Sequence, residues 1–225
     1  EGTVLLDFDP SAELIGGVLA YGINSENVQR NASPLKGKVG SEIGVRELNI
    51  VDDGLLRGGL GTRSFDDEGV PKQRTTIIEE GVLKNFLYNH YTARKEGIES
   101  TGNAYRGLSA FESPPRVSPS NMIIEPGTKG WEKLKGEVDR GIIAGRFSGN
   151  VEFSNGSFSG VVKQGFLVEE GEIRHPLIGT MISGNTYQLL KNISGMSREV
   201  KDVPTFGFVK TPMTRIENVR ITGKP

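Results

Sequence analysis

The sequence contains no cysteine and only two histidines among its 225 residues. Without cysteine the chain can form no disulfide, offer no thiolate nucleophile and build no sulfur-ligated metal site. The absence is also typical of a reducing compartment, so we expect a cytoplasmic location. His90 and His175 lie far apart, and neither is followed by glutamate. Because a zinc peptidase helix needs the H-E-x-x-H spacing, we interpret both histidines as structural and expect no metal bound by this chain alone.

Long hydrophobic runs and an excess of charge of one sign are also lacking. The longest apolar-leaning run, Leu14 to Ile23, is far shorter than the ~20 residues that a transmembrane helix needs. Lys and Arg number 27 against 28 Asp and Glu, which leaves a net charge of -1. Such a chain has no long-range field that attracts phosphate backbones, so we expect neither a membrane nor a nucleic acid as its partner.

Glycine, by contrast, is abundant, with 31 residues and no fixed period. This composition predicts many tight turns and therefore a sheet-rich fold. Two β-rich segments are each interrupted by Glu-Glu-Gly, at 79–81 and at 169–171, and a third contains Asn155-Gly156. Glycine tolerates the positive φ of such turns, so each segment is predicted to be a β-hairpin.

Four helices are predicted between these strands. The first has Asp9 as its N-cap and Pro10 at its first helical position. The others are expected over residues 91–97, 130–140 and 186–195, the last with Asn185 as N-cap and Gly195 as C-cap. The proline-rich segment 110–127 is predicted to be an irregular connection. Because no βαβ alternation is visible, the pattern indicates an α+β fold with mainly antiparallel sheet, in one large domain or two closely packed ones.

Three consecutive carboxylates, Asp66, Asp67 and Glu68, form the densest acidic cluster, in "GTRSFDDEGVP". They lack the alternating spacing that wraps an EF-hand loop around calcium. We interpret them as a turn in which Gly69 takes a positive φ and one Asp accepts an Asx-type hydrogen bond. A catalytic role and a loop that orders a partner remain as alternatives, so all three are candidate substrate- or partner-binding residues.

A second polar cluster, "STGNAYRG", contributes the candidates Thr101, Asn103 and Arg106. Backbone N–H groups around Gly102 could form a nest for an anion or a peptide carbonyl, with Arg106 as a bidentate donor. The alternative is a polar turn between a helix and a strand. The chain has no G-x-S-x-G element and no phosphate-binding loop, so no catalytic residue is assigned.

The order of several motifs is more informative than any one of them. The chain resembles the TldD/PmbA family, known both as modulators of DNA gyrase and as a metallopeptidase system. The resemblance covers nearly the whole chain and is carried by these blocks: "SPLKGKVGSEI", "VDDG", "FDDEGVP", "IIEEGVLKNFLYNHYTARKEG", "STGNAYR", "GIIAGRFSG", "NGSFSGVVKQGFLVEEGEIRHPL", "ISGNTYQLLKNI" and "TPMTRIENVRITG".

The resemblance implies that residues 1–225 form a C-terminal domain of this family, without the family's N-terminal α/β domain. It further implies a PmbA-type (TldE-like) chain, because the TldD-type member carries a His-Glu-His zinc motif in its N-terminal part and a C-terminal cysteine. Zinc is therefore expected in a TldD-type partner and not here. One departure is that this chain reads Asn155-Gly156-Ser157-Phe158-Ser159 where the family usually has "TGDFS", so those residues receive no substrate role.

The leading hypothesis is a subunit of a TldD-type zinc metallopeptidase that acts on small or unfolded peptides. This chain would enclose the substrate and support a hetero- or homo-oligomeric assembly. A stand-alone peptide- or protein-binding module, such as a gyrase modulator, is the alternative from another class. A complete metallopeptidase is the third hypothesis, and it requires all metal ligands to lie in the N-terminal part.

Overall fold

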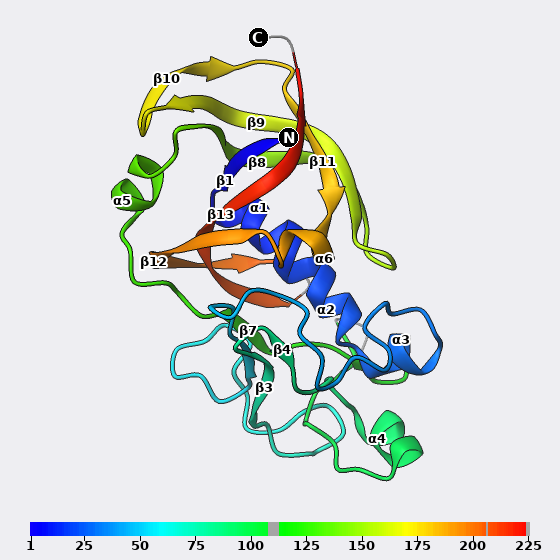
Figure 1. Cartoon of the computed structure of the whole chain (residues 1–225). Helices are drawn as coiled ribbons and strands as arrows, with labels where there is room; N and C mark the ends of the chain where they lie inside the picture. Colours follow the sequence, from blue (N-terminus) through cyan, green and yellow to red (C-terminus); the bar gives the residue numbers. More distant parts are fainter. Residues whose placement is uncertain (108–112, 206, 224–225) are drawn as a thin grey trace.

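The computed structural model describes residues 1–107, 113–205 and 207–223. Within these ranges, a large mixed sheet of eleven strands curves around a central helical segment, and a small two-stranded sheet, β5–β6, lies apart from it. The long strands β8 and β9, together with β10, form one end of the molecule, and β3, β4 and the helix α4 form the other (Figure 1).

The strands have the following bounds: β1 (Gly2–Leu6), β2 (Ile50–Asp53), β3 (Arg74–Glu79), β4 (Val82–Leu83), β5 (Ala104–Tyr105), β6 (Arg116–Val117), β7 (Asn121–Ile124), β8 (Arg140–Glu152), β9 (Ser157–Glu169), β10 (Glu172–Leu177), β11 (Met181–Asn185), β12 (Ile193–Pro204) and β13 (Phe208–Thr222). The helices are α1 (Phe8–Ser11), the π-helix η1 (Ala12–Gly17), α2 (Val18–Gly22), α3 (Ser25–Gln29), α4 (His90–Glu96), α5 (Trp131–Gly136) and α6 (Thr186–Leu189).

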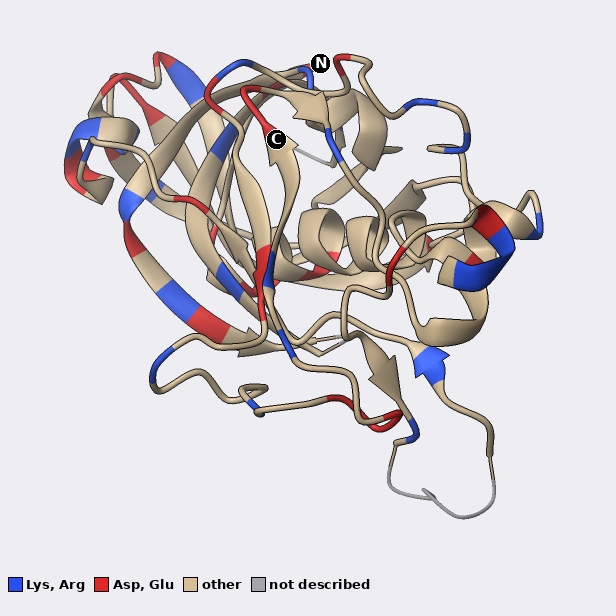
Figure 2. Cartoon of the chain, turned by 90° about the horizontal axis from the view of Figure 1, so that it is seen from below, with Lys and Arg blue, Asp and Glu red and all other residues tan. Residues whose placement is uncertain are grey.

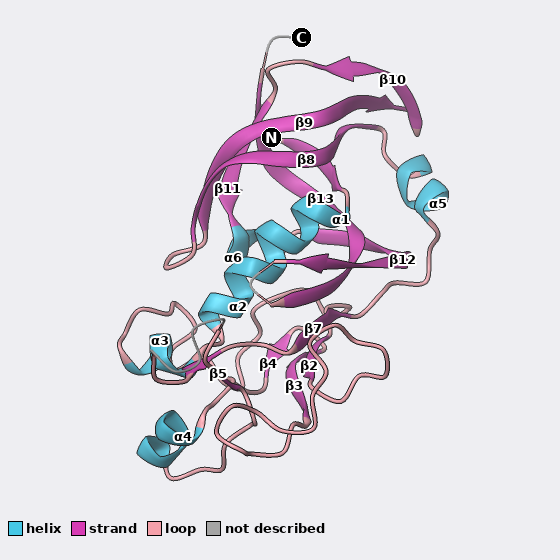
Figure 3. Ribbon diagram, turned by 180° about the vertical axis from the view of Figure 1, so that it is seen from behind, coloured by secondary structure: helices cyan, strands magenta, loops and turns pink. Residues whose placement is uncertain are grey.

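The central helical segment α1–η1–α2 packs its apolar side into the main core, where Leu14, Ile15 and Leu19 are fully buried. It crosses the concave side of the curved sheet (Figure 3). A Cβ on Gly16 would lie 2.8 Å from Val209 of β13, so this glycine lets the helix approach the sheet closely. The Thr186 hydroxyl donates a hydrogen bond to the Leu14 carbonyl at 2.6 Å and so gives this carbonyl of the π-helix a partner.

The predicted fold class, α+β with mainly antiparallel sheet, is confirmed in part, because the large sheet is mixed. β1 runs parallel to β8, and β13 runs parallel to β7. The other pairings between the described strands of this sheet are antiparallel. Both parallel pairs join strands that are distant in sequence, and local periodicity carries no information about such pairs.

The predicted turns are confirmed. Glu80 and Gly81 have φ of 47° and 76°, and Glu170 and Gly171 have φ of 53° and 74°, so both Glu-Glu-Gly turns use two left-handed residues. The third hairpin, β8–β9, turns through residues 153–156 with Gly156 at a φ of 79°.

The predicted helix boundaries are less accurate. Asp7, and not Asp9, caps the first helix, because Asp7 is extended and accepts the Phe8 N–H at 2.7 Å. The third and fourth predicted helices end early, at Gly136 and Leu189, and the sequence that follows them enters strands β8 and β12. Tertiary pairing with β9 and β13 overrides helical periodicity there.

The segment 110–127 was predicted to be irregular, but it contains β6 and β7. Its residues 110–112 lie outside the described part of the chain. Short strands among prolines are stabilised by their partners, here β5, β2 and β13.

Charged residues of both signs are interspersed over the chain (Figure 2), as the balanced composition predicts. In the described ranges no helix is both long and apolar enough to cross a bilayer.

Candidate functional site

The acidic turn is built around Asp66, whose side chain is almost fully buried at 3% exposure. Its Oδ1 accepts the backbone N–H groups of Glu68 and Val70, both at 2.9 Å, and its Oδ2 accepts the N–H of Ala104 at 3.0 Å. Gly69 has a φ of 80°. The predicted Asx-type turn with a left-handed glycine is therefore confirmed, and Asp66 also holds strand β5.

The other two carboxylates also bind backbone. Asp67 Oδ2 accepts the N–H of Arg106 at 2.7 Å, and the Asp67 N–H donates to the Ala104 carbonyl at 3.2 Å. Glu68 Oε2 accepts the N–H of His90, the first residue of α4, at 2.7 Å. A carboxylate at the start of a helix is favourable. The triplet therefore joins its own turn to the free edge of β5 and to α4.

The second predicted cluster lies beside the first. The Thr101 hydroxyl accepts the N–H of Tyr88 at 2.7 Å and lies 2.6 Å from Asn103 Oδ1. The N–H groups of Gly102 and Asn103 donate to Ser100 Oγ and the Tyr88 carbonyl, respectively. The amides around Gly102 thus have partners within the chain. The structure brings all six candidate residues together around β5.

Asn103 connects this cluster to a buried polar network. Its Nδ2 donates to Asp52 Oδ2 at 2.6 Å and to the Ser118 carbonyl at 3.1 Å. Asp52 Oδ1 accepts the N–H of Ser120 at 2.8 Å, and Lys72 Nζ donates to Ser120 Oγ at 2.7 Å. Asp52 is 1% and Lys72 9% exposed.

Burial dominates the protonation equilibria of this network. It raises the pKa of Asp52 to about 6, although the hydrogen bonds from Asn103 and the Ser120 amide and the charge of Lys72 act in the opposite direction. Burial lowers the pKa of Lys72, and the nearby carboxylates, Asp52 first, partly counteract it. Each group therefore loses part of its preference for the charged state.

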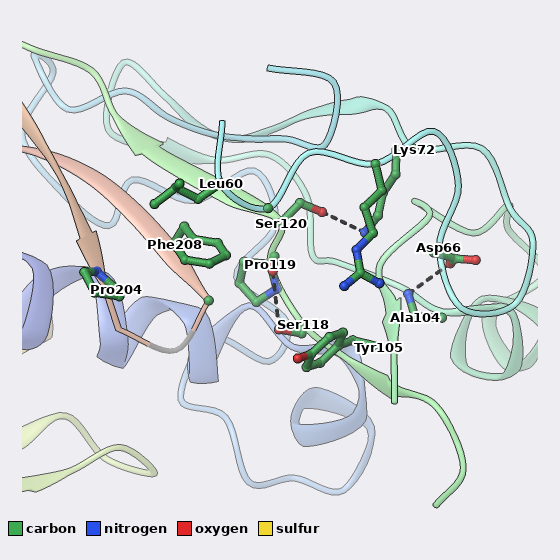
Figure 4. A pocket seen from close by; sticks show the side chains of 13 residues that line it. Leu60, Asp66, Lys72, Ala104, Tyr105, Ser118, Pro119, Ser120, Pro204 and Phe208 are labelled. Atoms are coloured by element: carbon green, nitrogen blue, oxygen red, sulfur yellow. Dashed lines mark hydrogen bonds between the residues drawn. The ribbon is translucent and has the colours of Figure 1, made fainter. Parts of the chain in front are cut away.

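A cavity of about 450 Å³ opens onto this network (Figure 4). It lies between the connection from β2 to β3, strand β5, residues 118–120, the last residue of β12 and the residues around the start of β13. Its lining consists of Leu60, Gly61, Arg63, Asp66, Lys72, Ala104, Tyr105, Ser118, Pro119, Ser120, Pro204, Gly207 and Phe208.

Sequence reasoning missed Asp52, Lys72 and Ser120, which complete this site. Asp52 had a visible signal, since it is a carboxylate that directly follows the apolar residues Ile50 and Val51 within strand β2. Lys72 had none, because a single lysine after a turn is ordinary in sequence and only the fold buries it.

The residues present do not fit a zinc ion. The chain has no thiolate, and both histidines are exposed, His90 on α4 and His175 on β10, at opposite ends of the molecule (Figure 1). The carboxylates of Asp66, Asp67 and Glu68 already accept backbone N–H groups. In the described ranges no three His, Asp or Glu side chains form a cluster that could hold a metal.

Comparison with known proteins gives a consistent family. The model of the PmbA/TldA metallopeptidase C-terminal domain matches residues 1–223. The metalloprotease PmbA homolog of Buchnera aphidicola is 33% identical over 81% of this chain and 38% of its own length. The chain spans less than half the length of the curated relatives that it matches.

Two solved structures share the fold. TldE from Thermococcus kodakarensis superposes with a TM-score of 0.92 and 31% identity, over 99% of this chain and 50% of the TldE chain. A Thermotoga maritima protein named as a candidate modulator of a DNA gyrase gives a TM-score of 0.89 and 37% identity, over 98% of this chain and 49% of its own. The chain therefore belongs to the PmbA/TldD family of metallopeptidase-related proteins.

Proposed function

We propose that this chain is the TldE-like part of a two-protein peptidase, in which a TldD-type partner holds the zinc and this chain encloses and positions small or unfolded peptides. The observation that carries the proposal is the similarity to TldE over nearly the whole chain, combined with a donor set that does not fit zinc. The proposed setting is the cytoplasm.

A subunit without metal raises catalysis by orienting the substrate. Correct orientation of reacting groups contributes up to about 7 to 11 kcal/mol in favourable cases, so a positioning subunit has ample room to act. Free strand edges offer one means, because main-chain pairing binds extended peptides with little regard to sequence.

The test is to express the full-length protein alone, the TldD-type protein from the same source alone, and the two together. Each sample is assayed for cleavage of an unstructured peptide, for zinc content after dialysis and for the mass of the complex. We expect cleavage and co-elution only in the mixture, with zinc that follows the TldD-type protein.

Two results would contradict the proposal. Zinc-dependent cleavage by this protein alone would indicate a complete peptidase. A TldD-type protein that is fully active by itself and does not co-elute would favour the alternative of a stand-alone binding module. The name given to the Thermotoga maritima relative supports that alternative, and its specific form is a gyrase modulator.

A further inference from the structure

The cavity described above has two chemically different ends. Lys72 and Ser120 lie on one side, whereas Leu60, Pro204 and Phe208 lie on the other (Figure 4). Leu60 is 64% exposed, so the apolar end also has an open rim. A cavity of this size falls within the range of about 300 to 1,000 Å³ that is typical of small-molecule sites.

The ammonium of Lys72 is the first group that distinguishes the polar end. In the described part of the chain its only hydrogen-bond partner is Ser120 Oγ, although an ammonium has three donors. The buried carboxylates of Asp52 and Asp66 act on this ammonium through their charge but do not hydrogen-bond to it. Asp66 accepts three backbone N–H groups, and Asp52 accepts the Asn103 side-chain amide and the Ser120 N–H. A buried cation with free donors favours an incoming anion.

Arg63 supplies a second cation on the cavity wall. Its Nη1 lies 3.2 Å from Asp67 Oδ1, and its guanidinium carbon lies 5.9 Å from the centroid of the Tyr105 ring. These contacts hold the side chain in place but use few of its five donors. A guanidinium fork matches a carboxylate in geometry, which an ammonium alone does not.

We propose that this cavity binds an organic carboxylate that carries an apolar group. The carboxylate lies against Lys72 and Arg63, and the apolar group lies against Phe208 and its neighbours. The C-terminal residue of a peptide and a free small acid share this chemistry. The peptide source rests on the proposed function, whereas the affinity for a carboxylate does not.

The experiment measures binding to the full-length protein by calorimetry with four probes. These are the peptide acetyl-Ala-Ala-Leu with a free C-terminus, the same peptide as its C-terminal amide, 3-phenylpropionate, and inorganic phosphate. We expect the free-acid peptide to bind at least ~10-fold more tightly than its amide, which corresponds to about 1.4 kcal/mol. Phosphate, which lacks an apolar group, should bind more weakly than either acid.

Three variants locate the binding. Lys72→Met retains the length of the side chain without its charge and should weaken the free-acid peptide ~10-fold or more, and Arg63→Gln should weaken it several-fold. The matched control is Lys84→Met, because Lys84 is a partly exposed lysine that pairs with Glu79 on another part of the surface. Thermal unfolding of each variant reports whether it folds. If Lys72→Met does not fold, Arg63→Gln still tests the proposal, because the Arg63 side chain is half exposed and its replacement should leave the fold intact.

The outcomes separate the two proposals. Binding of the peptide acid but not of 3-phenylpropionate supports a peptide end, whereas binding of 3-phenylpropionate alone supports a free-acid ligand and removes the peptide source. The protein could bind the carboxylates while its mixture with a TldD-type protein cleaves no peptide. That result would support the carboxylate site in the cavity and reject the proposed function. Equal binding of acid and amide, phosphate binding as tightly as the acids, or unchanged affinity in both folded variants would overturn the inference.

Discussion

The two ends of this molecule are stabilised in different ways. At one end, β8 and β9 pair in a single register from Arg140–Glu169 to Glu152–Ser157, with only Gly145 and Gln164 outside the ladder, and buried and exposed residues alternate along much of β9. At the other end, the connection from β2 to β3 and the segment from residue 100 to residue 120 have little regular structure. Asp66 ties the connection to Ala104, while Asp52 and Asn103 tie β2 to Ser118 and Ser120. The comparison shows that side-chain carboxylates and amides take the place of strand pairing in the loops beside the cavity.

The largest effect is expected for Asp66→Ala at the loop-rich end. The change leaves the N–H groups of Glu68, Val70 and Ala104 without their acceptor. Because each unpaired buried donor costs about 1 to 3 kcal/mol, we expect a loss on the order of 3 kcal/mol in the free energy of unfolding. Urea denaturation measures the loss, and hydrogen exchange should show faster opening of residues 66–70 and 104. A loss below ~1 kcal/mol would show that water replaces the carboxylate.

The next effect concerns the pH dependence of stability. Asp52 has a pKa of about 6 in the folded chain, against 3.8 for an unperturbed aspartate. The folded state therefore holds this proton more tightly, and the associated stability is complete below about pH 4 and is lost as the pH rises through 6. Two pKa units correspond to roughly 3 kcal/mol, so we expect a decrease on the order of 2 kcal/mol between pH 4 and 7.

The control for this prediction is Asp52→Asn. Its free energy of unfolding should not show the decrease between pH 4 and 7 that Asp52 causes. Burial also raises the pKa of Glu13, while hydrogen bonds lower those of the exposed Glu137 and Glu152. These groups are present in both proteins, so the difference between the two pH profiles isolates Asp52. Parallel profiles would mean that Asp52 does not titrate in this range.

A smaller effect is expected at the sheet end, for Gly149→Ala. Gly149 pairs with Gly160 across β8 and β9, and a Cβ there would lie 2.3 Å from both Gly160 Cα and the Ser159 carbonyl oxygen. The strands must shift, which typically costs about 1 to 3 kcal/mol and is partly offset by the better strand propensity of alanine. We expect a net loss of ~1 kcal/mol in a thermal unfolding curve. Gly136→Ala, where nothing lies near the new Cβ, serves as the matched control.

The smallest effect is expected for Asp67→Asn. Asparagine keeps an oxygen that can accept the Arg106 N–H, and the ion pair with Arg63, whose side chain is 55% exposed, contributes little. The stability of the full-length protein and its assembly should change by less than ~0.5 kcal/mol, as measured by urea denaturation and size-exclusion chromatography. A normally assembled, stable variant with peptidase activity reduced a hundredfold would instead assign Asp67 to the reaction.

Much of the fold could be predicted from local patterns. The three hairpins were found because glycine and asparagine mark positive-φ turns, and Asn185 was correctly predicted to cap α6. The ends of α5 and α6 were not predicted correctly, since the residues near Val138 and Ile193 fit a helix or a strand equally well. Only pairing with the neighbouring strands β9 and β13 selects the strand there. Only part of the candidate site was predicted, namely the polar clusters at 66–68 and 101–106.

The sequence by itself determined the chemistry that this chain can offer, namely carboxylates, amides and cations without thiolates, and it determined the turns that local φ preferences dictate. Tertiary structure alone decided that Asp52, Lys72 and Ser120 meet beside one cavity, because they come from segments that only long-range sheet pairing brings together. It also decided their protonation, since burial, a property of the whole fold, raises the pKa of Asp52 and lowers that of Lys72.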